Sequence, residues 1–177
     1  EVFVNGGPDS PEAPVSNMSY EAAELYCDWL TQVYNSYPKK KKYQEVLFRL
    51  PTEKEWEFAA SAKSNAPYPW GGYYFKNSKG CYLSNSYNSE KEPCIDCDIT
   101  SIANDGGYFL VNSTSYFPNN FGLYNTSGNV AEMVQGGEIA KGGSWEDLPE
   151  DCTITSRKNI NGPSPAIGFR VFMEVIR

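Results

Sequence analysis

The chain has 177 residues, of which 40% are hydrophobic, 15% aromatic and 21% charged, and its formal net charge at pH 7 is −7. These values are typical of one globular domain with its own core and exclude an intrinsically disordered chain. The acidic balance argues against nucleic acid as a partner, and no apolar run is long enough to span a membrane. The sequence contains no histidine, which excludes Ser-His and Cys-His hydrolase chemistry and His-ligated zinc and iron sites.

A helix is predicted near the start of the chain. Ser19 is a favourable N-cap residue. Apolar residues follow it at the three- and four-residue spacing of one helix face: Ala23, Cys27, Leu30 and Tyr34. We therefore expect a helix from Ser19 to about Tyr34, with Cys27 as a small buried residue. The run Lys39–Lys42 that follows is expected to be a solvated loop and only weakly indicates an anionic partner.

A short strand at Val46–Leu50 and a second helix are predicted next. Thr52 and Glu55 have the spacing of a capping box, in which the threonine hydroxyl accepts from a backbone N–H and the glutamate reaches back to the N-cap. The residues expected on the inward face of this helix are Trp56, Ala59 and Ala60. We interpret this stretch as the end of a strand and the start of a helix, with no chemical role.

No helical or strand period persists from Ser61 to Asn120, where Gly, Pro, Asn, Ser and Tyr dominate. Such a long loop inside a compact domain is usually functional or held by something other than secondary structure, and calcium is a candidate for that support. Three later stretches are predicted to be strands that close a small antiparallel sheet: Ile139–Ser144, Thr153–Arg157 and Ile167–Val175.

The five cysteines are Cys27, Cys81, Cys94, Cys97 and Cys152. Their odd number leaves at least one free thiol or an intermolecular bond. A Cys₄ zinc site needs four thiolates, but the sequence has a single C-x-x-C pair. We favour a loop disulfide of Cys81 with Cys94 or Cys97 over zinc, and free thiols remain the alternative.

The segment Asn119–Glu132 has the composition of a loop that binds a hard cation. Asn125 offers an amide oxygen, Glu132 a carboxylate, and Gly128 and Val130 backbone carbonyls at intermediate positions. Ca²⁺ prefers six to eight oxygens of this mixed kind. The alternative is a Gly/Asn-rich turn without metal, in which the glutamate starts a helix.

Four stretches in this order resemble the signature of the formylglycine-generating-enzyme (sulfatase-modifying factor) family. They are R-L-P-T-E-K-E-W-E-F-A-A (49–60), N-N-F-G-L-Y-N-T-S-G-N-V-A-E (119–132), K-G-G-S-W (141–145) and I-G-F-R-V (167–171). The resemblance is clearest over residues 14–171 and implies a single domain over 1–177. The implied fold is α+β, a loop-rich variant of the C-type-lectin fold with two helices and a small antiparallel sheet. Members usually have further strands before the region of Pro14, so we expect an N-terminally incomplete fold.

The resemblance also implies two structural calcium sites. The first comprises Asn125, the carbonyls of Gly128 and Val130, and Glu132, each of which matches the family motif. The second comprises Asn85, Ser86, Asp105 and Tyr108, although the stretch between its two halves is expanded relative to the family pattern.

Catalytic members hold Cu(I) between two cysteines in the segment after Gly-Gly-Ser and use it with O₂ to oxidise a substrate cysteine. Carried over by position, the second of these cysteines is Cys152, but the first is replaced by Asp147. A carboxylate is a hard ligand that does not suit soft Cu(I). We therefore predict no copper and no catalytic residues, and we expect Cys152 to lie in a strand.

Several loop phrases resemble the lipoproteins of gliding motility and type IX secretion, of the GldK/PorK and GldJ kind. They include Y-P-W-G-G (68–72), K-N-S-K-G-C-Y-L-S-N (76–85), N-D-G-G-Y (104–108) and S-Y-F-P-N-N-F-G-L-Y-N (115–125). This resemblance implies a structural component of a bacterial envelope assembly, at the periplasmic face of the outer membrane or the cell surface, with other protein subunits as partners. A lectin-like ligand-binding module and a divergent copper-dependent oxidase are the alternatives.

The loop from Tyr68 to Phe117 carries many aromatic residues without regular structure to bury them: Trp70, Tyr73, Tyr74, Phe75, Tyr82 and Tyr87. We expect some of them to pack on the domain and others to contribute to a protein–protein interface. We also expect an upstream segment or another chain to cover an apolar edge along Pro14–Trp29.

Overall fold

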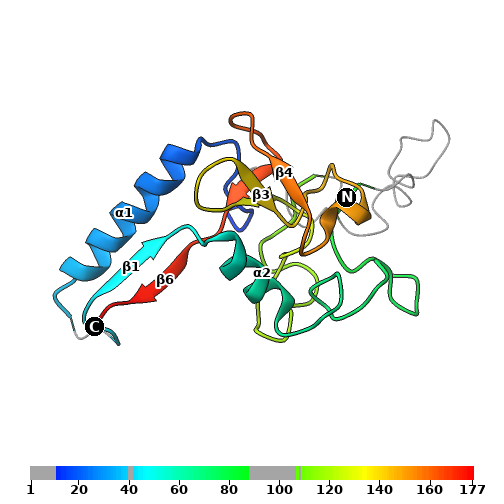
Figure 1. The fold of residues 1–177 in the computed structure, drawn as a ribbon, viewed down its shortest axis with the longest axis horizontal. Helices are drawn as coiled ribbons and strands as arrows, with labels where there is room; N and C mark the ends of the chain where they lie inside the picture. The colour runs from blue at the N-terminus through cyan, green and yellow to red at the C-terminus, as the bar shows by residue number, and fades with distance from the viewer. Residues whose placement is uncertain (1–10, 40–41, 88–106, 108) are drawn as a thin grey trace.

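A computed structural model describes residues 11–39, 42–87, 107 and 109–177 (Figure 1). The elements in this part of the chain are α1 (Tyr20–Ser36), β1 (Val46–Arg49), α2 (Glu53–Ser61), β2 (Ala131–Met133), β3 (Ile139–Lys141), the 3₁₀-helix η2 (Pro149–Cys152), β4 (Arg157–Asn159), β5 (Ile167–Phe169) and β6 (Phe172–Val175). The described structure is therefore α+β, as predicted. None of its helices has the length and apolar character needed to cross a membrane.

Helix α1 begins where the sequence predicts. The Ser19 side chain accepts a hydrogen bond from the backbone N–H of Ala22 at 3.2 Å, which satisfies one of the free donors of the first turn. Ala23 and Cys27 are buried against the core, as predicted for Cys27, which is a free thiol. The helix continues to Ser36, two residues beyond the expected end.

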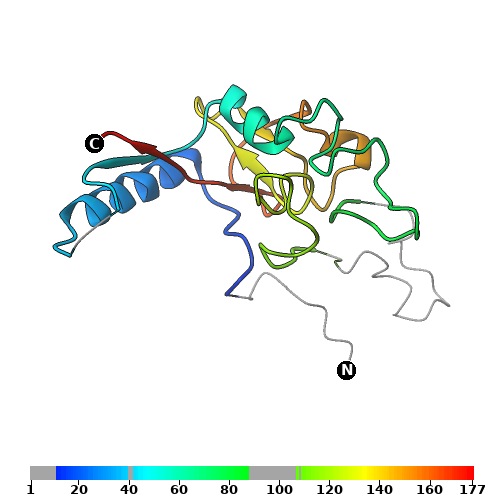
Figure 2. The ribbon, with the colours of Figure 1, turned by 90° about the horizontal axis from the view of Figure 1, so that it is seen from below.

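Strand β1 is enclosed on both of its edges. One edge pairs antiparallel with β6. Along the other edge, Thr31 Oγ1 accepts from the Phe48 N–H at 2.8 Å, and the Asn35 amide accepts from the N–H and donates to the carbonyl of Val46, at 3.0 and 2.8 Å. Side chains of α1 thus take the place of a third strand, and α1, β1 and β6 form one end of the molecule (Figures 1 and 2).

The predicted capping box starts α2. Thr52 Oγ1 accepts from the Glu55 N–H, and the Glu55 carboxylate accepts from the Thr52 N–H at 2.8 Å. Arg49 at the end of β1 holds the same carboxylate with two hydrogen bonds of 2.8 and 2.7 Å, which ties the strand end to the helix start. Trp56 and Ala60 form the buried face of α2, as expected, whereas Ala59 is only half-buried.

The central sheet has the strand order β4-β3-β2-β5 and is mixed, which corrects the antiparallel prediction. β2 pairs antiparallel with β3 but parallel with β5. Strand β2 was not predicted, and the alternative reading of Glu132 as a helix start is wrong. The strand expected at Ile139–Ser144 ends at Lys141, because Gly142 and Gly143 have positive φ angles of 85° and 65° and turn the chain away.

The two later strand predictions are only partly correct. No strand forms at Thr153–Ser156: Pro149 opens the 3₁₀-helix η2, Cys152 ends it, and β4 begins only at Arg157. The prediction that Cys152 lies in a strand is therefore wrong. The stretch Ile167–Val175 contains two strands, because the chain leaves the central sheet after β5 and enters the β1–β6 ribbon as β6.

The long segment between α2 and β2 contains no helix or strand over its described residues, as expected. Part of its aromatic content forms a separate core of Tyr68, Phe75 and Cys152, against which Trp70 and Tyr82 pack. Tyr68 and Trp70 stack with ring centroids 4.8 Å apart. Tyr73 and Tyr74 remain 72% and 81% exposed, so the expected division between packed and exposed aromatics is confirmed.

Candidate functional site

Glu132 lies at the centre of a buried polar network. Its carboxylate accepts from Trp56 Nε1 at 2.7 Å and from Arg170 Nε and Nη2 at 2.9 and 2.7 Å. The parallel pairing of β2 with β5 sets Glu132 opposite Gly168, which brings Arg170 beside the carboxylate. The second role of Arg170 Nη2 is a 2.8 Å hydrogen bond to the Tyr124 carbonyl, which joins the preceding loop to the network.

Charge balance explains why this network can be buried. Glu132 is only 4% exposed, and an ionised carboxylate in such a place needs an opposite charge and hydrogen-bond donors. Arg170 supplies both, and the attraction of the Glu132 carboxylate raises the pKa of its guanidinium. The sequence analysis named both residues within motifs but did not predict that they pair.

Asn125 is another predicted ligand of the first calcium site, and hydrogen bonds hold its side-chain amide in one orientation. Its Nδ2 donates to the carbonyls of Asn112 and Ser113 at 3.1 and 3.0 Å. Its Oδ1 is buried and has no hydrogen-bond partner within the described part of the chain. Asn125, Val130 and Glu132 line one cleft of about 390 Å³. A buried amide oxygen without a donor is what a metal ligand would leave behind, so this residue fits a cation site.

The two predicted carbonyl ligands, of Gly128 and Val130, flank a rigid residue. The Asn129 N–H donates to the Asn85 carbonyl at 2.8 Å, and the Asn129 carbonyl accepts from the Trp145 N–H at 3.0 Å. Gly128 has φ +70°, and a Cβ there would come within 2.1 Å of the Asn85 carbonyl oxygen. The loop is therefore fixed by close backbone packing at this point.

Arg170 changes what the first site can bind. Its guanidinium lines the same cleft and already neutralises the Glu132 carboxylate, the one charged ligand of the predicted set. A cation here would share that carboxylate with Arg170 and depend mainly on neutral oxygens. The donor set fits Ca²⁺ through Asn125 and the loop carbonyls, with lower affinity than a free carboxylate would provide.

The second predicted calcium site is described only in part, since Asp105 and Tyr108 lie outside the described residues. Asn85 and Ser86 are fully buried, and Ser86 Oγ has no hydrogen-bond partner among the residues that the structure describes. Asn85 Nδ2 donates to the Phe109 carbonyl and, at 3.4 Å, to Asn129 Oδ1. Cys94 and Cys97 also lie outside the described residues. Cys81 is an exposed free thiol, so the expected loop disulfide of Cys81 with Cys94 or Cys97 is wrong, and the free-thiol alternative holds for Cys81.

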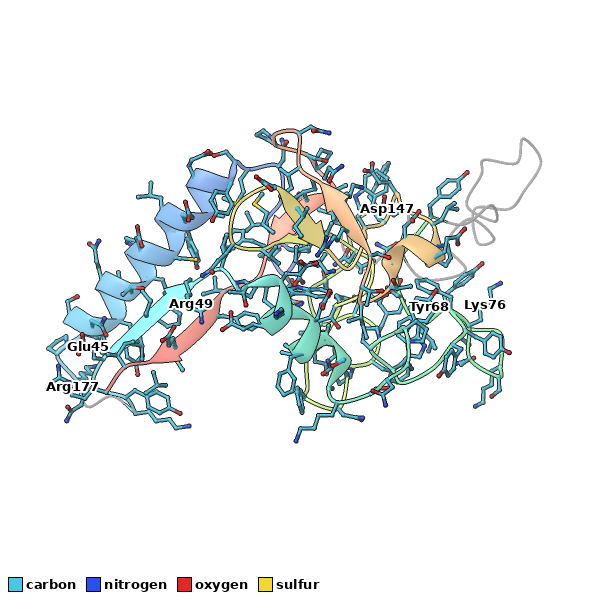
Figure 3. The ribbon with its side chains drawn as sticks, viewed as in Figure 1. Glu45, Arg49, Tyr68, Lys76, Asp147 and Arg177 are labelled. Carbon is cyan, nitrogen blue, oxygen red and sulfur yellow. The ribbon has the colours of Figure 1, made fainter. Side chains whose placement is uncertain are left out.

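The position of the expected copper pair is occupied by a closed polar cluster. Asp147, which lies beside η2 (Figure 3), accepts from Lys158 Nζ at 2.9 and 2.8 Å and from the Ser144 hydroxyl. Cys152 is fully buried, with its Sγ 3.8 Å from the Ser144 carbonyl oxygen. Burial, reinforced by the nearby carboxylates of Asp147 and Asp151, raises the pKa of the Cys152 thiol to about 12. At neutral pH this thiol is protonated, and a metal would have to displace its proton in order to bind.

One buried cluster was missed by sequence reasoning. Lys141 is fully buried, and its Nζ contacts the carboxylates of Glu53 and Glu57 at 3.1 and 2.8 Å. Arg157 also pairs with Glu53, at 2.6 Å. The i, i+4 spacing of the two glutamates on α2 was the one available signal. Over the described residues, no group of three or more Cys, Asp or Glu side chains is arranged to hold a metal.

The family model for the sulfatase-modifying factor enzyme 1-like domain matches residues 5–175 of this chain. The chain is 29% identical over 177 residues to the inactive C-alpha-formylglycine-generating enzyme 2 of Mus musculus, covering 90% of this chain and 48% of that protein. It is 30% identical over 134 residues to the formylglycine-generating enzyme of Bos taurus, covering 72% and 29%. It spans about half the length of the first of these relatives and less than a third of the second.

Among solved structures, PvdO from Pseudomonas aeruginosa superposes with a TM-score of 0.70 at 22% identity, over 94% of this chain and 64% of that one. This similarity concerns the fold alone. It agrees with the architecture described above, the formylglycine-generating-enzyme variant of the C-type-lectin-like fold.

Proposed function

The chain belongs to the family of sulfatase-modifying factor enzyme 1-like domains, and from this premise we propose that it is a non-catalytic member with a structural role. Its place would be in a protein assembly of the bacterial cell envelope, of the gliding-motility and type IX secretion kind that its loop phrases resemble. Calcium would stabilise its loops, and other protein subunits would be its partners.

The main support for a loss of oxidase chemistry is the burial and protonation of Cys152. Cu(I) chemistry in this family needs two thiolates, and Asp147 stands at the first position as the ion-pair partner of Lys158. Cys152 is buried, protonated at neutral pH and in contact with backbone carbonyls. Neither residue can bind copper without breaking the packing and the ion pair that hold them.

The names of the relatives allow either activity, because one is called inactive and another a formylglycine-generating enzyme. The choice for this chain therefore depends on its own residues. Asp147 and Cys152 favour the inactive alternative for the reasons above.

Calcium is proposed at Asn125, Gly128, Val130 and Glu132. When bound, it would link the loop before β2 to the strand itself. The unpartnered Oδ1 of Asn125 supports this proposal, and the pairing of Glu132 with Arg170 limits the expected affinity. A differential scanning calorimetry series with added CaCl₂ or EDTA tests it. We expect EDTA to lower the melting temperature of the wild-type chain. The melting temperature of Asn125→Ala should be the same with and without EDTA. A wild type that is insensitive to EDTA would contradict the calcium proposal.

The assembly role is supported by the aromatic surface. Tyr73 and Tyr74 project from a loop without regular structure, and Phe117 is 75% exposed further along the same segment. Tyrosine and phenylalanine supply contact area at a low entropic cost and are enriched in protein interfaces. Hydrogen exchange over residues 68–87 and 109–117 should slow when the native assembly is present. Equal exchange with and without the assembly would contradict this role.

A copper titration tests the absence of oxidase chemistry directly. The chain is titrated with Cu(I) against a competing chelator, and a cysteine-containing peptide is assayed for aldehyde formation. The matched variants are Cys152→Ser and Cys81→Ser, because Cys81 is an exposed free thiol that can bind copper adventitiously. We expect no aldehyde and no copper binding that depends on Cys152. Stoichiometric binding that survives Cys81→Ser and disappears in Cys152→Ser would overturn the proposal.

A further inference from the structure

The outer face of α1 carries a continuous apolar stripe. Leu25, Trp29 and Val33 follow one another at a four-residue spacing on the helix and are 69%, 52% and 42% exposed. Tyr37, the extended C-cap residue directly after the helix, is the next residue at this spacing and is 50% exposed. The buried face of the same helix is a different one, formed by Ala23 and Cys27. In both ribbon views, β1 and β6 lie on one side of α1, and no other described element runs along the opposite side (Figures 1 and 2).

Four large apolar side chains in a row exceed what scattered surface residues explain. A helix that is apolar on its inner face and on its outer face is usually buried on both. Trp29 is also anchored, because its ring lies 5.6 Å from that of Tyr26, which in turn meets Phe169 of β5 at 5.7 Å. The Trp29 ring is thus supported from one side and leaves about half of its surface free for a packing partner.

Acidic residues lie in the first half of α1, and basic residues follow its C-terminal end. The helix carries three acidic residues, Glu21, Glu24 and Asp28, and no basic residue. All three are exposed and lie in the first nine residues of the helix. The basic residues come directly after the helix, where Lys39 and Lys42 are exposed. The surface is thus acidic at one end of the stripe and basic at the other.

We propose that this stripe is a dimer interface that pairs α1 antiparallel with α1 of a second copy of the chain. A twofold axis between Trp29 and Val33 places Leu25 against the partner's Tyr37, so that apolar residues meet along the whole stripe. The same rotation sets the acidic end of each helix against the basic end of the other. A parallel arrangement would set acid against acid.

Charge also distinguishes this partner from a membrane surface. An interfacial helix normally carries lysine or arginine on its polar face, whereas α1 has acidic residues only. The dimer is expected to be weak, because two helices of about 25 Å bury less than the roughly 800 Å² per partner of a standard interface. It does not depend on the loss of oxidase chemistry, so the two proposals can fail separately.

Sedimentation equilibrium over about 10 to 500 µM tests the interface in the 177-residue chain, since weak complexes dissociate in this range. We expect reversible dimers that are weakened by salt, because exposed charge pairs are screened. The double variant Leu25→Gln/Trp29→Gln should be monomeric at every concentration. Phe58→Gln, which removes an exposed aromatic residue of α2 instead, should dimerise like the wild type. Helix content from circular dichroism verifies that each variant is folded.

A charge-swap experiment tests the antiparallel geometry. The acid-reversed variant Glu21→Lys/Glu24→Lys and the base-reversed variant Lys39→Glu/Lys42→Glu should each dimerise about tenfold more weakly than the wild type, because like charges then face each other at both ends. An equimolar mixture of the two variants should form a heterodimer at least as stable as the wild-type dimer.

Three results would overturn the proposal. The first is a monomer at all concentrations. The second is a dimer that persists in Leu25→Gln/Trp29→Gln, or an equimolar mixture of the acid-reversed and base-reversed variants that dimerises more weakly than the wild type. The third is a monomeric chain that binds vesicles of anionic lipid through α1.

Discussion

Removing the charge of Glu132 tests whether the ion pair holds the centre of the domain. In Glu132→Gln, the new amide presents N–H groups to the Arg170 guanidinium, which keeps its charge but loses its carboxylate partner. The Arg170 side chain is only 26% exposed and that of Glu132 only 5%, so solvent compensates little of the loss. Breaking such a pair by removing one partner costs about 3 kcal/mol. For a domain of this size, that corresponds to a melting temperature about 10 °C lower.

The assay is urea unfolding of Glu132→Gln, Arg170→Met and the double variant, each in EDTA and in calcium. The double variant removes both charges, so we expect it to lose about 2 kcal/mol less than the sum of the two single variants. Glu45→Gln is the matched control. Glu45 pairs with Arg177 at a similar distance of 2.8 Å, but the two side chains are 44% and 76% exposed at the far end of the molecule (Figure 3). Its loss should cost less than about 1 kcal/mol.

The two metal conditions separate the roles that Glu132 can play. If the ion pair is the main role, Glu132→Gln is destabilised in EDTA as well as in calcium. A variant that equals the wild type in EDTA and differs from it only in calcium would refute the ion-pair argument, because the carboxylate would then act as a metal ligand alone. A double variant no more stable than the sum of the two single losses would refute it as well.

Three further outcomes follow from the described contacts. At pH 8, iodoacetamide should modify the exposed Cys81 within minutes and leave the buried Cys152 unmodified until the chain unfolds, as peptide mass spectrometry of the native and denatured chain would show. The ion pair and the capping box lower the pKa of Glu55 to about 2, so its contribution to stability is present above about pH 4.5 and is lost as the pH falls toward 2. Because its side chain is 39% exposed, that contribution is only about 1 kcal/mol, and Glu55→Gln should flatten the acid limb of a urea-midpoint series by this amount. Gly128→Ala should lower the melting temperature well beyond Gly122→Ala, since both glycines have positive φ but only the first has a backbone oxygen where the new Cβ would lie, and equal losses would contradict the close packing.

The helix starts could be predicted because their signals are local. Ser19 and Thr52 act on backbone groups within three residues, so the sequence alone shows them. The core face of α1 follows from a regular spacing in the same way. Strand β2 could not be predicted, because three residues, Ala131–Met133, are too few to show alternation and pair with strands 8 to 36 residues away.

The buried charges were harder to predict for a different reason. Lysine is almost never fully buried unless it is paired, so nothing in the stretch around Lys141 indicates its position. Its partners Glu53 and Glu57 lie more than 80 residues earlier in the chain. The strand expected around Cys152 does not form, because Pro149 favours the first turn of a helix, a local signal that the strand prediction did not take into account.

The four stretches that carry the family resemblance meet in two polar clusters. Trp56 comes from the first stretch, Glu132 from the second and Arg170 from the fourth, and these three form one network. Lys141 comes from the third stretch and binds two glutamates of the first, among them Glu53. Each stretch therefore supplies a charged or hydrogen-bonding side chain to one of these two clusters.

Neither cluster includes the residues at the copper position. Asp147 and Cys152 are held by Lys158 and Ser144, and these four residues form a separate contact group around η2. A substitution at the copper position therefore leaves the buried network intact. The signature identifies chains that can fold in this way, whereas the copper pair that the resemblance implies for catalytic members falls on two positions outside the clusters, Asp147 and Cys152. Because these positions take no part in the buried clusters, this chain retains all four stretches although Asp147 stands at the first of the two positions.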